Sequence, residues 1–411
     1  MEFEQEEVLE PMSPGAQYLK SSALSLYIVG VMELEIPIDE SIYMPFLREL
    51  FIPINHRFSS IMVFKERGEK KWKRVEVNLK DHVNVPVLPS GLSTDYYDEC
   101  FNEYLSKLAW EQLPESRPLW EVHIFNYPTH SHGFLRHMNR FFPGMINTAY
   151  DFGFNLLKSS LIEDDKSPIR SGHGVECGPF SITTITLSLE HIKQIKTKLQ
   201  VTVNDVITGA IIFGTRLYMQ RENQDSSKAS STALVLLNTR AIGGYKSVSE
   251  MIKPNAKMPW GNRFAFLHVS IPKLTASELN NPLKFVNKAR QFVKRQRNSA
   301  SVNLTRQFLD AITKFRGPEA TARYIYGKLN NSSLMISNMI GPVEQMALAN
   351  IPIKGLYFTV PGIPQSLQLT IVSYVEKLRI VMSVEKGFID PNKFKSCIEY
   401  AFEAISKAAL E

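Results

Sequence analysis

The chain has 411 residues, of which 44% are hydrophobic and 21% are charged, and this composition is ordinary for a globular protein of two or three domains. It excludes collagen-like, coiled-coil and wholly disordered chains. The longest apolar run, 201–214, contains Asn204 and Asp205 and precedes Arg216, so no run reaches the roughly 18–20 residues of a membrane-spanning helix. Five glutamates in the first ten residues replace the basic region of a secretory signal. We therefore expect a protein on the cytosolic side, with any membrane contact at its surface.

Charge is divided unevenly along the chain. Residues 1–150 carry 14 Lys+Arg against 21 Asp+Glu, net −7, whereas residues 151–411 carry 33 against 20, net +13. This contrast predicts two domains. The densest basic stretch, 284–297, could meet anionic phosphates of a nucleotide-bearing cofactor or a lipid surface, or could be a solvated helix face. Nucleic acid is disfavoured, because no stacking aromatics are interleaved with these residues.

Three widely spaced cysteines, Cys100, Cys177 and Cys397, fit neither a zinc or redox motif nor a set of disulfides. Reduced structural thiols are the simplest interpretation. A reactive thiol at Cys177, beside Gly178, is the alternative.

Strands and helices alternate through the first half, in a mixed order rather than a strict βαβ repeat. A charged loop containing Gly68 between two strands is typical of a hairpin. From apolar periodicity, the predicted elements are a strand over 25–33, a helix over Asp39–Leu50, strands over Phe58–Phe64 and Trp72–Val77, a helix over Tyr97–Leu108 and a strand over Leu119–Phe125.

Periodicity fails between Asn126 and Pro179, and the polar, Gly-containing stretch 163–178 is typical of a linker. We expect an N-terminal domain over 1–160, a linker over 161–179 and a C-terminal domain over 180–411. The predicted elements of the second half are a strand over Ile182–Leu187, a helix capped by Ser188, a helix from Val203 buried along one side, a strand over Ala233–Leu237, paired strands over Leu367–Tyr374 and Leu378–Val384, and a helix from Pro391 to about Ala409.

Four short motifs stand at element ends, and each also has a purely structural interpretation. Pro118 and Trp120 can be packing residues, and Asn204 and Asp205 can cap a helix or position a substrate. Asn238 and Arg240 can hold a phosphate, cross-link the domains or form a strand-end turn, and Gly341 can serve a tight turn. The motifs are Pro118-Leu119-Trp120-Glu121, Asn204-Asp205, Asn238-Thr239-Arg240 and Ser337-Asn338-Met339-Ile340-Gly341-Pro342.

In this order the motifs resemble the wax ester synthase/diacylglycerol acyltransferase family, particularly its plant branch, from Pro11-Met12-Ser13-Pro14 to the C-terminal helix. The resemblance implies a mixed α/β, two-domain fold like that of chloramphenicol acetyltransferase and other CoA-dependent acyltransferases, with a tunnel between the domains. It implies transfer of a fatty acyl group from acyl-CoA to a long-chain alcohol or to diacylglycerol. Acyl-CoA would be a co-substrate, and no bound cofactor or metal is implied.

By the same resemblance, we expect the protein at the cytosolic face of the endoplasmic reticulum membrane, or at the cell membrane. The residues that would line the substrate tunnel are Pro118, Leu119, Trp120, Glu121, Asn204, Asp205, Asn238, Arg240, Ser337, Asn338, Gly341 and Pro342.

Attack of an alcohol on a thioester needs a base for the hydroxyl proton and donors for the oxyanion. In the family that base is the second histidine of an H-H-x-x-x-D-G motif, which this sequence does not contain. The chain has no Asp or Glu from Val122 through Tyr150, and it passes from the strand ending at Phe125 directly into Gly133-Phe134-Leu135-Arg136. We interpret this as an internal deletion near 127–133, which leaves an uncovered sheet edge and an under-filled core in the N-terminal domain.

Other histidines are weak replacements for the missing base. His130 and His132 lie in a Ser/Gly-flanked loop, which holds a side chain poorly. His123 is interpreted as a strand histidine with satisfied hydrogen bonds. The apolar segment 355–364 could enter a bilayer or form a lipid entrance, or could simply connect two strands.

Two classes of function therefore stay open. One is a membrane-associated O-acyltransferase that makes wax esters or triacylglycerol. The other is a non-catalytic lipid- or CoA-binding relative, splice form or partner subunit. A soluble acyltransferase for small phenolic alcohols is disfavoured, because its H-x-x-x-D signature is absent as well.

Overall fold

The computed structural model describes residues 9–12, 14–64, 70–108, 111–127, 162–172, 174–175, 178–238, 264–297 and 301–411. His130, His132, Cys177 and Arg240 lie outside these residues. Within them, no helix is long and apolar enough to cross a membrane.

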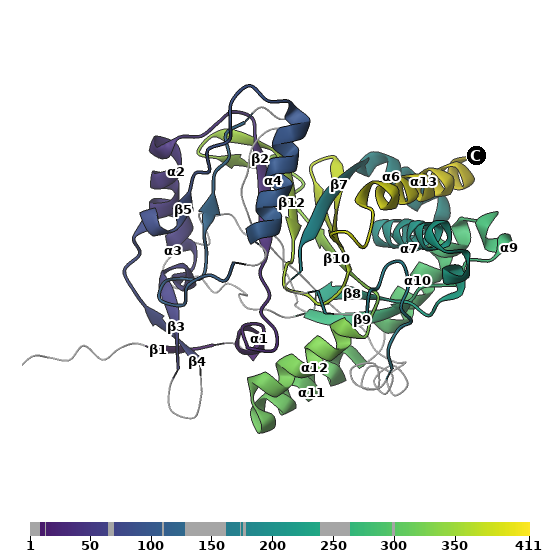
Figure 1. Ribbon diagram of the computed structural model, residues 1–411, viewed down its shortest axis with the longest axis horizontal. Coiled ribbons are helices and arrows are strands. Elements are labelled where there is room, and N and C mark those ends of the chain that lie inside the picture. Colours follow the sequence, from purple (N-terminus) through teal and green to yellow (C-terminus); the bar gives the residue numbers. More distant parts are fainter. Residues whose placement is uncertain are drawn as a thin grey trace, which may run out of the picture.

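Helices and strands are intermixed along the chain, as the sequence predicts (Figure 1). The helices are α1 Pro14–Tyr18, α2 Glu40–Phe46, α3 Ile52–Ile54, α4 Thr94–Leu108, α6 Leu189–Leu199, α7 Val203–Glu222, α9 Ala276–Leu279, α10 Leu283–Arg297, α11 Ser301–Arg316, α12 Pro318–Asn330 and α13 Pro391–Leu410. The strands are β1 Leu9–Pro11, β2 Val29–Leu34, β3 Ser60–Phe64, β4 Lys70–Arg74, β5 Val83–Asn84, β6 Val122–His123, β7 Phe180–Ser188, β8 Thr232–Asn238, β9 Phe264–Ser270, β10 Leu334–Ile340, β11 Ala347–Leu348, β12 Ile351–Thr359, β13 Leu367–Tyr374 and β14 Lys377–Glu385.

The C-terminal half is built on one six-stranded mixed sheet, in the order β7-β14-β13-β10-β8-β9. β13 and β14 pair antiparallel from Leu367↔Val384 to Tyr374↔Lys377, which confirms the predicted hairpin. α6, α7, α10 and α13 lie on one face of this sheet (Figure 1). Ser188 caps α6 by accepting a hydrogen bond from the backbone N–H of His191, as predicted.

α7 is buried on nearly all sides, and the prediction that it buries one side was therefore wrong. Two glycines explain the difference. A Cβ at Gly209 would lie 2.7 Å from Val286 Cα of α10, and one at Gly214 would lie 2.8 Å from Ile398 Cα of α13. The helices approach α7 so closely because these positions have no side chain.

The N-terminal half consists of small sheets, ordered β1-β4-β3, β11-β12-β2 and β5-β6. β3 and β4 pair antiparallel, which confirms the predicted hairpin. β6 spans only Val122–His123, so the predicted strand over Leu119–Phe125 is shorter than expected. Its parallel partner β5 has two residues, which limits the ladder that β6 can form.

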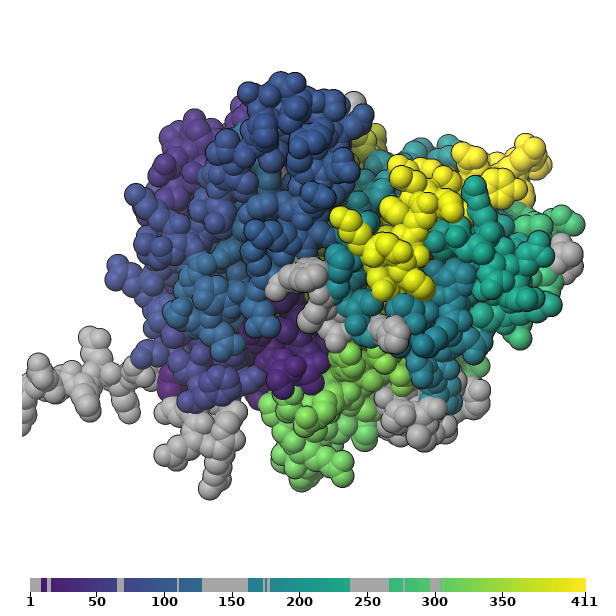
Figure 2. All heavy atoms as spheres, in the orientation of Figure 1, coloured from purple at the N-terminus to yellow at the C-terminus, as the bar shows by residue number. Residues whose placement is uncertain are grey.

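One strand from the C-terminal sequence completes the N-terminal half. β12 pairs antiparallel with β2, from Leu34↔Ile353 to Val29↔Thr359. Apolar residues of β2, β6 and β12 share one core cluster, including Val31, Val122 and Leu356. The halves therefore interlock, and in Figure 2 the purple-to-blue N-terminal residues and the teal-to-yellow C-terminal residues form adjoining surfaces.

Two predicted loops are more ordered than their sequences indicate. In the predicted linker, buried Asp164 accepts hydrogen bonds from Thr232 N (2.6 Å) and Ser333 Oγ (2.7 Å), and buried Arg170 donates to Asn330 O (2.8 Å). In the segment 355–364, the first five residues belong to β12 and the rest connect it to β13. Most of this segment is buried, which favours the strand-connection interpretation. The division of the chain at 161–179 stays a prediction.

Candidate functional site

The Ser337–Pro342 motif divides between the two faces of the large sheet. Side chains alternate along β10. Ile336 belongs to the C-terminal core cluster under the helices, whereas Met339 packs against the N-terminal core cluster. Ser337 therefore faces the N-terminal half, and Asn338 faces α7.

Asn338 connects β10 to the start of α7. Its Nδ2 donates to Asn204 Oδ1 at 2.9 Å. Helix capping is performed by Thr202 and Asp205, because Asp205 N donates to Thr202 Oγ1 at 3.1 Å and Thr202 N donates to Asp205 Oδ2 at 2.9 Å. Asp205 thus has the predicted capping role, whereas Asn204 does not cap and instead holds the strand.

Gly341 allows the close backbone approach that the sequence predicts, whereas no hydrogen-bonded turn is formed at Gly341 and Pro342. A Cβ at Gly341 would lie 2.0 Å from Ser373 O, so only glycine fits this position. The carbonyl of Pro342 accepts from Val375 N at 3.1 Å.

Polar residues line the sheet face that meets the N-terminal half, and sequence reasoning missed them. Gln368 Nε2 donates to Val360 O at 3.0 Å and its Oε1 accepts from Val360 N at 3.1 Å. The hydroxyls of Thr359 and Ser383 lie 2.7 Å apart. Gln368 and Thr370 are two residues apart and alternate with Leu367, Leu369 and Ile371 in β13, and this spacing was the signal of a polar face.

An ion pair joins the halves on the same face. Arg379 of β14 pairs with Glu33 Oε1 of β2, with side chains 13% and 12% exposed, and its guanidinium lies 5.1 Å from the ring centroid of Tyr357. Gly355 makes room, since a Cβ there would lie 2.0 Å from Glu33 Oε2. This pair fixes β2 and β12 to the large sheet.

Pro118 and Trp120 are packing residues, as their structural interpretation predicts. Trp120 is 6% exposed, and its Nε1 donates to Phe58 O at 2.8 Å. Its indole stacks on His82 with ring centroids 4.1 Å apart. Burial lowers the pKa of His82, which favours the neutral imidazole in this apolar setting.

Glu121 and His123 form a second polar group on the same segment. Glu121 Oε2 lies 3.2 Å from His123 Nε2, Glu121 Oε1 pairs with Arg117, and His123 Nδ1 lies 2.9 Å from the Tyr104 hydroxyl. The hydrogen bond from His123, followed by the charge of Arg117, holds the pKa of Glu121 below its ordinary value. Both nitrogens of His123 are occupied, which confirms the interpretation of a satisfied strand histidine.

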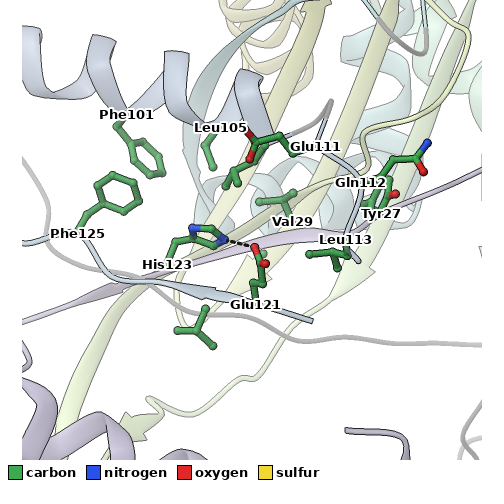
Figure 3. Close-up of a pocket in the computed structure, with 13 residues that line it drawn as sticks. Tyr27, Val29, Phe101, Leu105, Glu111, Gln112, Leu113, Glu121, His123 and Phe125 are labelled. Carbon is green, nitrogen blue, oxygen red and sulfur yellow. Dashed lines mark hydrogen bonds and ion pairs between the residues drawn. The ribbon is translucent and has the colours of Figure 1, made fainter. Parts of the chain in front are cut away.

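These two residues border a cavity of about 150 Å³ between α4, β2 and β6 (Figure 3). Its wall combines apolar side chains with two polar groups, the Glu121–His123 pair and the residues Glu111 and Gln112 (Figure 3). The lining residues are Tyr27, Val29, Gly30, Phe101, Leu105, Leu108, Glu111, Gln112, Leu113, Glu121, Val122, His123 and Phe125.

The Asn238-Thr239-Arg240 motif lies only partly within the described residues. Asn238 is the last residue of β8, and the rest of its motif, including Arg240, lies outside the described residues. No cluster of three or more His, Cys, Asp or Glu that could hold a metal ion occurs within the described part of the chain.

Comparison with known proteins supports the resemblance. Residues 260–406 match the family model of the WS/DGAT C-terminal domain. The chain is similar to wax ester synthase/diacylglycerol acyltransferase 7 of Arabidopsis thaliana, at 24% identity over 98% of each chain. It is 25% identical to wax ester synthase/diacylglycerol acyltransferase 5 of the same plant, over 100% of this chain and 95% of that protein.

Solved structures agree on the fold. The wax ester synthase/diacylglycerol acyltransferase from Marinobacter aquaeolei VT8 superposes with a TM-score of 0.58 at 14% identity, covering 93% of this chain and 95% of that chain. The first condensation domain of the CDA synthetase gives 0.56 at 11% identity, covering 98% and 97%. The expected mixed α/β acyltransferase-like fold is confirmed.

The alignment with the first relative contains positions that this chain does not fill. The alignment with the first of them has 478 positions, and 98% of this chain is about 403 residues, so about 75 positions of the relative face gaps. The match to the WS/DGAT C-terminal domain model and the similarity to wax ester synthase/diacylglycerol acyltransferases over nearly the whole chain thus agree with each other.

Proposed function

We propose that this chain shares the substrates of its family, acyl-CoA and a long-chain alcohol or diacylglycerol, but does not by itself complete the acyl transfer. The observation that carries the first part is similarity over nearly the full length to proteins named wax ester synthase/diacylglycerol acyltransferase. The second part, that the chain does not complete the transfer, is supported by the surroundings of its histidines.

Ester synthesis on this scaffold needs an imidazole with a free nitrogen beside the acceptor hydroxyl. The sequence lacks H-H-x-x-x-D-G. His82 Nδ1 donates to Trp120 O at 2.7 Å while the imidazole stacks on the indole, and both nitrogens of His123 are engaged. Neither imidazole is arranged as a base, so we infer a lipid- and CoA-binding protein related to the enzymes.

The test separates binding from turnover. The purified full chain, supplied with membranes, is titrated with oleoyl-CoA by calorimetry and assayed for ester formation from labelled oleoyl-CoA with hexadecanol or diacylglycerol. We expect saturable binding and no ester above a heat-treated control. Absence of binding would exclude the substrate class.

Steady ester formation would show that a base is present after all. The variants His123→Gln, His130→Ala and His132→Ala would then identify it. A loss of ester formation with unchanged oleoyl-CoA binding marks the residue that acts on the proton.

We also propose peripheral attachment to the cytosolic face of the endoplasmic reticulum membrane. Support comes from the basic helix α10, whose Lys284 and Lys294 are exposed, and from the water-insoluble products named in the relatives' titles. Each exposed cation near an anionic surface contributes about 1 kcal/mol.

Sedimentation with vesicles tests this attachment. We expect binding to vesicles with 30% phosphatidylserine to fall at least fivefold in Lys284→Glu/Lys294→Glu, and to be unchanged in Lys377→Glu, an exposed lysine on the β13–β14 turn. Equal binding of all three proteins would exclude α10 as the contact.

A further inference from the structure

Positive charge is concentrated on three consecutive helices of the C-terminal half, α10, α11 and α12. Residues 283–330 carry 11 Lys+Arg against 2 Asp+Glu, net +9, whereas the whole chain has a formal net charge of +6. α10 contacts α11, and α11 packs against α12, so these charges belong to one region of the molecule. Figure 2 shows the light green residues of α11 and α12 as a projection at the lower edge of the molecule. Such a region attracts anionic partners.

The turn between α11 and α12 exposes an aromatic ring among cations. Phe315 is 79% exposed, and its neighbours Lys314 and Arg316 are exposed as well. The Lys314 ammonium lies 5.6 Å from the ring centroid of Phe315. α11 ends at Arg316, and Gly317, with a φ of 83°, leads the chain into α12. A helix C-terminus favours nearby cations, which accounts for Lys314 and Arg316 but not for the exposed ring.

The two acidic residues of this region leave the positive charge of the turn in place. Glu319 accepts hydrogen bonds from Ala23 N at 3.0 Å and from Ser22 Oγ, so its carboxylate is engaged with the N-terminal half. Asp310 precedes Phe315 by five residues, which places it about 140° away around α11. The exposed side of the turn therefore combines one ring with positive charge.

This combination favours a lipid surface over a protein partner. Among the described side chains of α10, α11 and α12, Phe315 is the one large apolar side chain that is exposed. A stable protein interface buries about 800 Å² on each side around an apolar centre, which a single ring does not provide. A bilayer requires less, because one aromatic ring can enter the headgroup region while flanking Lys and Arg side chains stay at the phosphates.

We propose that the turn between α11 and α12 is the point at which this protein inserts into an anionic membrane. Phe315 enters the boundary between headgroups and acyl chains, and Lys314 and Arg316 bind lipid phosphates. This inference rests on the peripheral attachment proposed above, and it adds an apolar anchor to the charges of α10. Because the ring is already exposed, its removal should weaken membrane binding without changing the stability of the fold.

Sedimentation with vesicles of 30% phosphatidylserine and 70% phosphatidylcholine measures the contribution of the ring. We expect Phe315→Ser to bind at least fivefold more weakly than the unmodified full chain, and Phe315→Trp to bind at least as tightly as the unmodified chain. Tyr400→Ser removes a ring of α13 that is 59% exposed, and its binding should stay within twofold. Thermal unfolding of the four proteins checks that folded chains are compared.

Quenching of tryptophan fluorescence by lipids with brominated acyl chains reports whether the ring enters the bilayer. The added tryptophan of Phe315→Trp should lose at least half of its emission on brominated vesicles, measured as the difference from the unmodified chain. The added tryptophan of Tyr400→Trp should not be quenched.

The outcomes separate this proposal from the attachment on which it rests. If the unmodified chain does not bind anionic vesicles, the peripheral attachment itself is wrong. If the unmodified chain and Phe315→Ser bind equally well, the attachment stands and the insertion point is wrong. Tight binding to polyglutamate, together with an unquenched tryptophan in Phe315→Trp, would identify an acidic polypeptide as the partner and overturn insertion into lipid.

Discussion

The two halves of the molecule differ in whether all their strands come from their own part of the sequence. The C-terminal half has one six-stranded sheet whose helices share a single large core cluster. The N-terminal half has three small sheets, and one of them depends on β11 and β12 from the C-terminal sequence. The N-terminal half therefore depends for part of its core on strands from the C-terminal sequence. This dependence is compatible with a fold like that of the solved relative, although about 75 aligned positions of the first sequence relative have no counterpart in this chain.

The comparison predicts that the stability of the C-terminal half is most sensitive to replacement of its fully buried cation, Arg216. Arg216 of α7 is 0% exposed and donates to the carbonyls of Pro272 (2.8 Å), Ala229 (2.9 Å) and Ile271 (2.6 Å). Arg216→Ala removes all three bonds and leaves a cavity, and we expect a loss of about 4 kcal/mol or more in the free energy of unfolding.

Urea unfolding followed by circular dichroism measures this loss. Arg316→Ala, at an exposed residue that ends α11, is the matched control and should stay within about 0.5 kcal/mol. If the two variants are equally stable, the hydrogen bonds from Arg216 to the three backbone carbonyls do not stabilise the C-terminal half.

The attachment between the halves should be the next most sensitive feature. Arg379→Met leaves the largely buried carboxylate of Glu33 without its ion-pair partner, and we expect a loss of about 3 kcal/mol in the free energy of unfolding. Glu33→Leu added to Arg379→Met removes the stranded charge and should recover most of the loss.

Limited proteolysis shows which half responds. In Arg379→Met, cleavage should increase in the N-terminal half before the large sheet is cut. Simultaneous cleavage of both halves would contradict the expectation that the N-terminal half depends more strongly on this ion pair than the C-terminal half does.

The sequence predicted local features well and long-range features poorly. The ends of the Leu367–Tyr374 strand and the start of the last helix at Pro391 were predicted correctly, because turn residues and a helix-starting proline mark them. The pairing of β12 with β2 was not predicted, because no local pattern encodes a partner more than 300 residues away. Arg216 was taken as the charge that ends an apolar run, whereas backbone carbonyls allow it to be buried inside the helix layer.

For the site, the sequence predicted the capping role of Asp205, the close backbone approach at Gly341 and the satisfied state of His123. It missed the polar face of the large sheet. The hydrogen-bond partners of Gln368 and Thr370 are the backbone carbonyls of Val360 and Phe358, and no local sequence pattern shows that these residues lie beside β13. The tunnel-lining role of the Ser337–Pro342 motif stays a prediction, and alternation along β10 sends Ser337 and Asn338 to opposite faces of the large sheet.

The stability of the protein should depend on pH through Lys328 of α12, and we expect this effect to be of intermediate size. Its side chain is 1% exposed, its Nζ lies 4.8 Å from the ring centroid of Tyr324, and burial lowers its pKa to about 7. The unfolded chain keeps this proton up to about pH 10.4, so between these values the unfolded state binds more protons and stability rises with pH. The slope is at most about 1.4 kcal/mol per pH unit.

Thermal unfolding from pH 6 to pH 10 measures this slope. The contribution of Lys328 should be absent in Lys328→Met, so the difference between the two proteins should be largest at pH 6 and shrink above pH 7. A constant difference across this range would show that Lys328 keeps its proton in the folded state.

The smallest effects should separate the two neighbouring residues at the start of α7. Thr202→Ala removes the side-chain oxygen that accepts from Asp205 N, which costs about 1 kcal/mol as for other N-caps, and it should not change oleoyl-CoA affinity. Asn204→Ala removes the bond to Asn338 and should cost about 0.5–1.5 kcal/mol. If Asn204 only fastens β10 to α7, its variant binds oleoyl-CoA as Thr202→Ala does when both are compared at equal folded fraction by calorimetry. A selective loss of affinity of more than threefold in Asn204→Ala would instead place this residue at the acyl-CoA site, and would give the C-terminal half a binding role alongside its structural one.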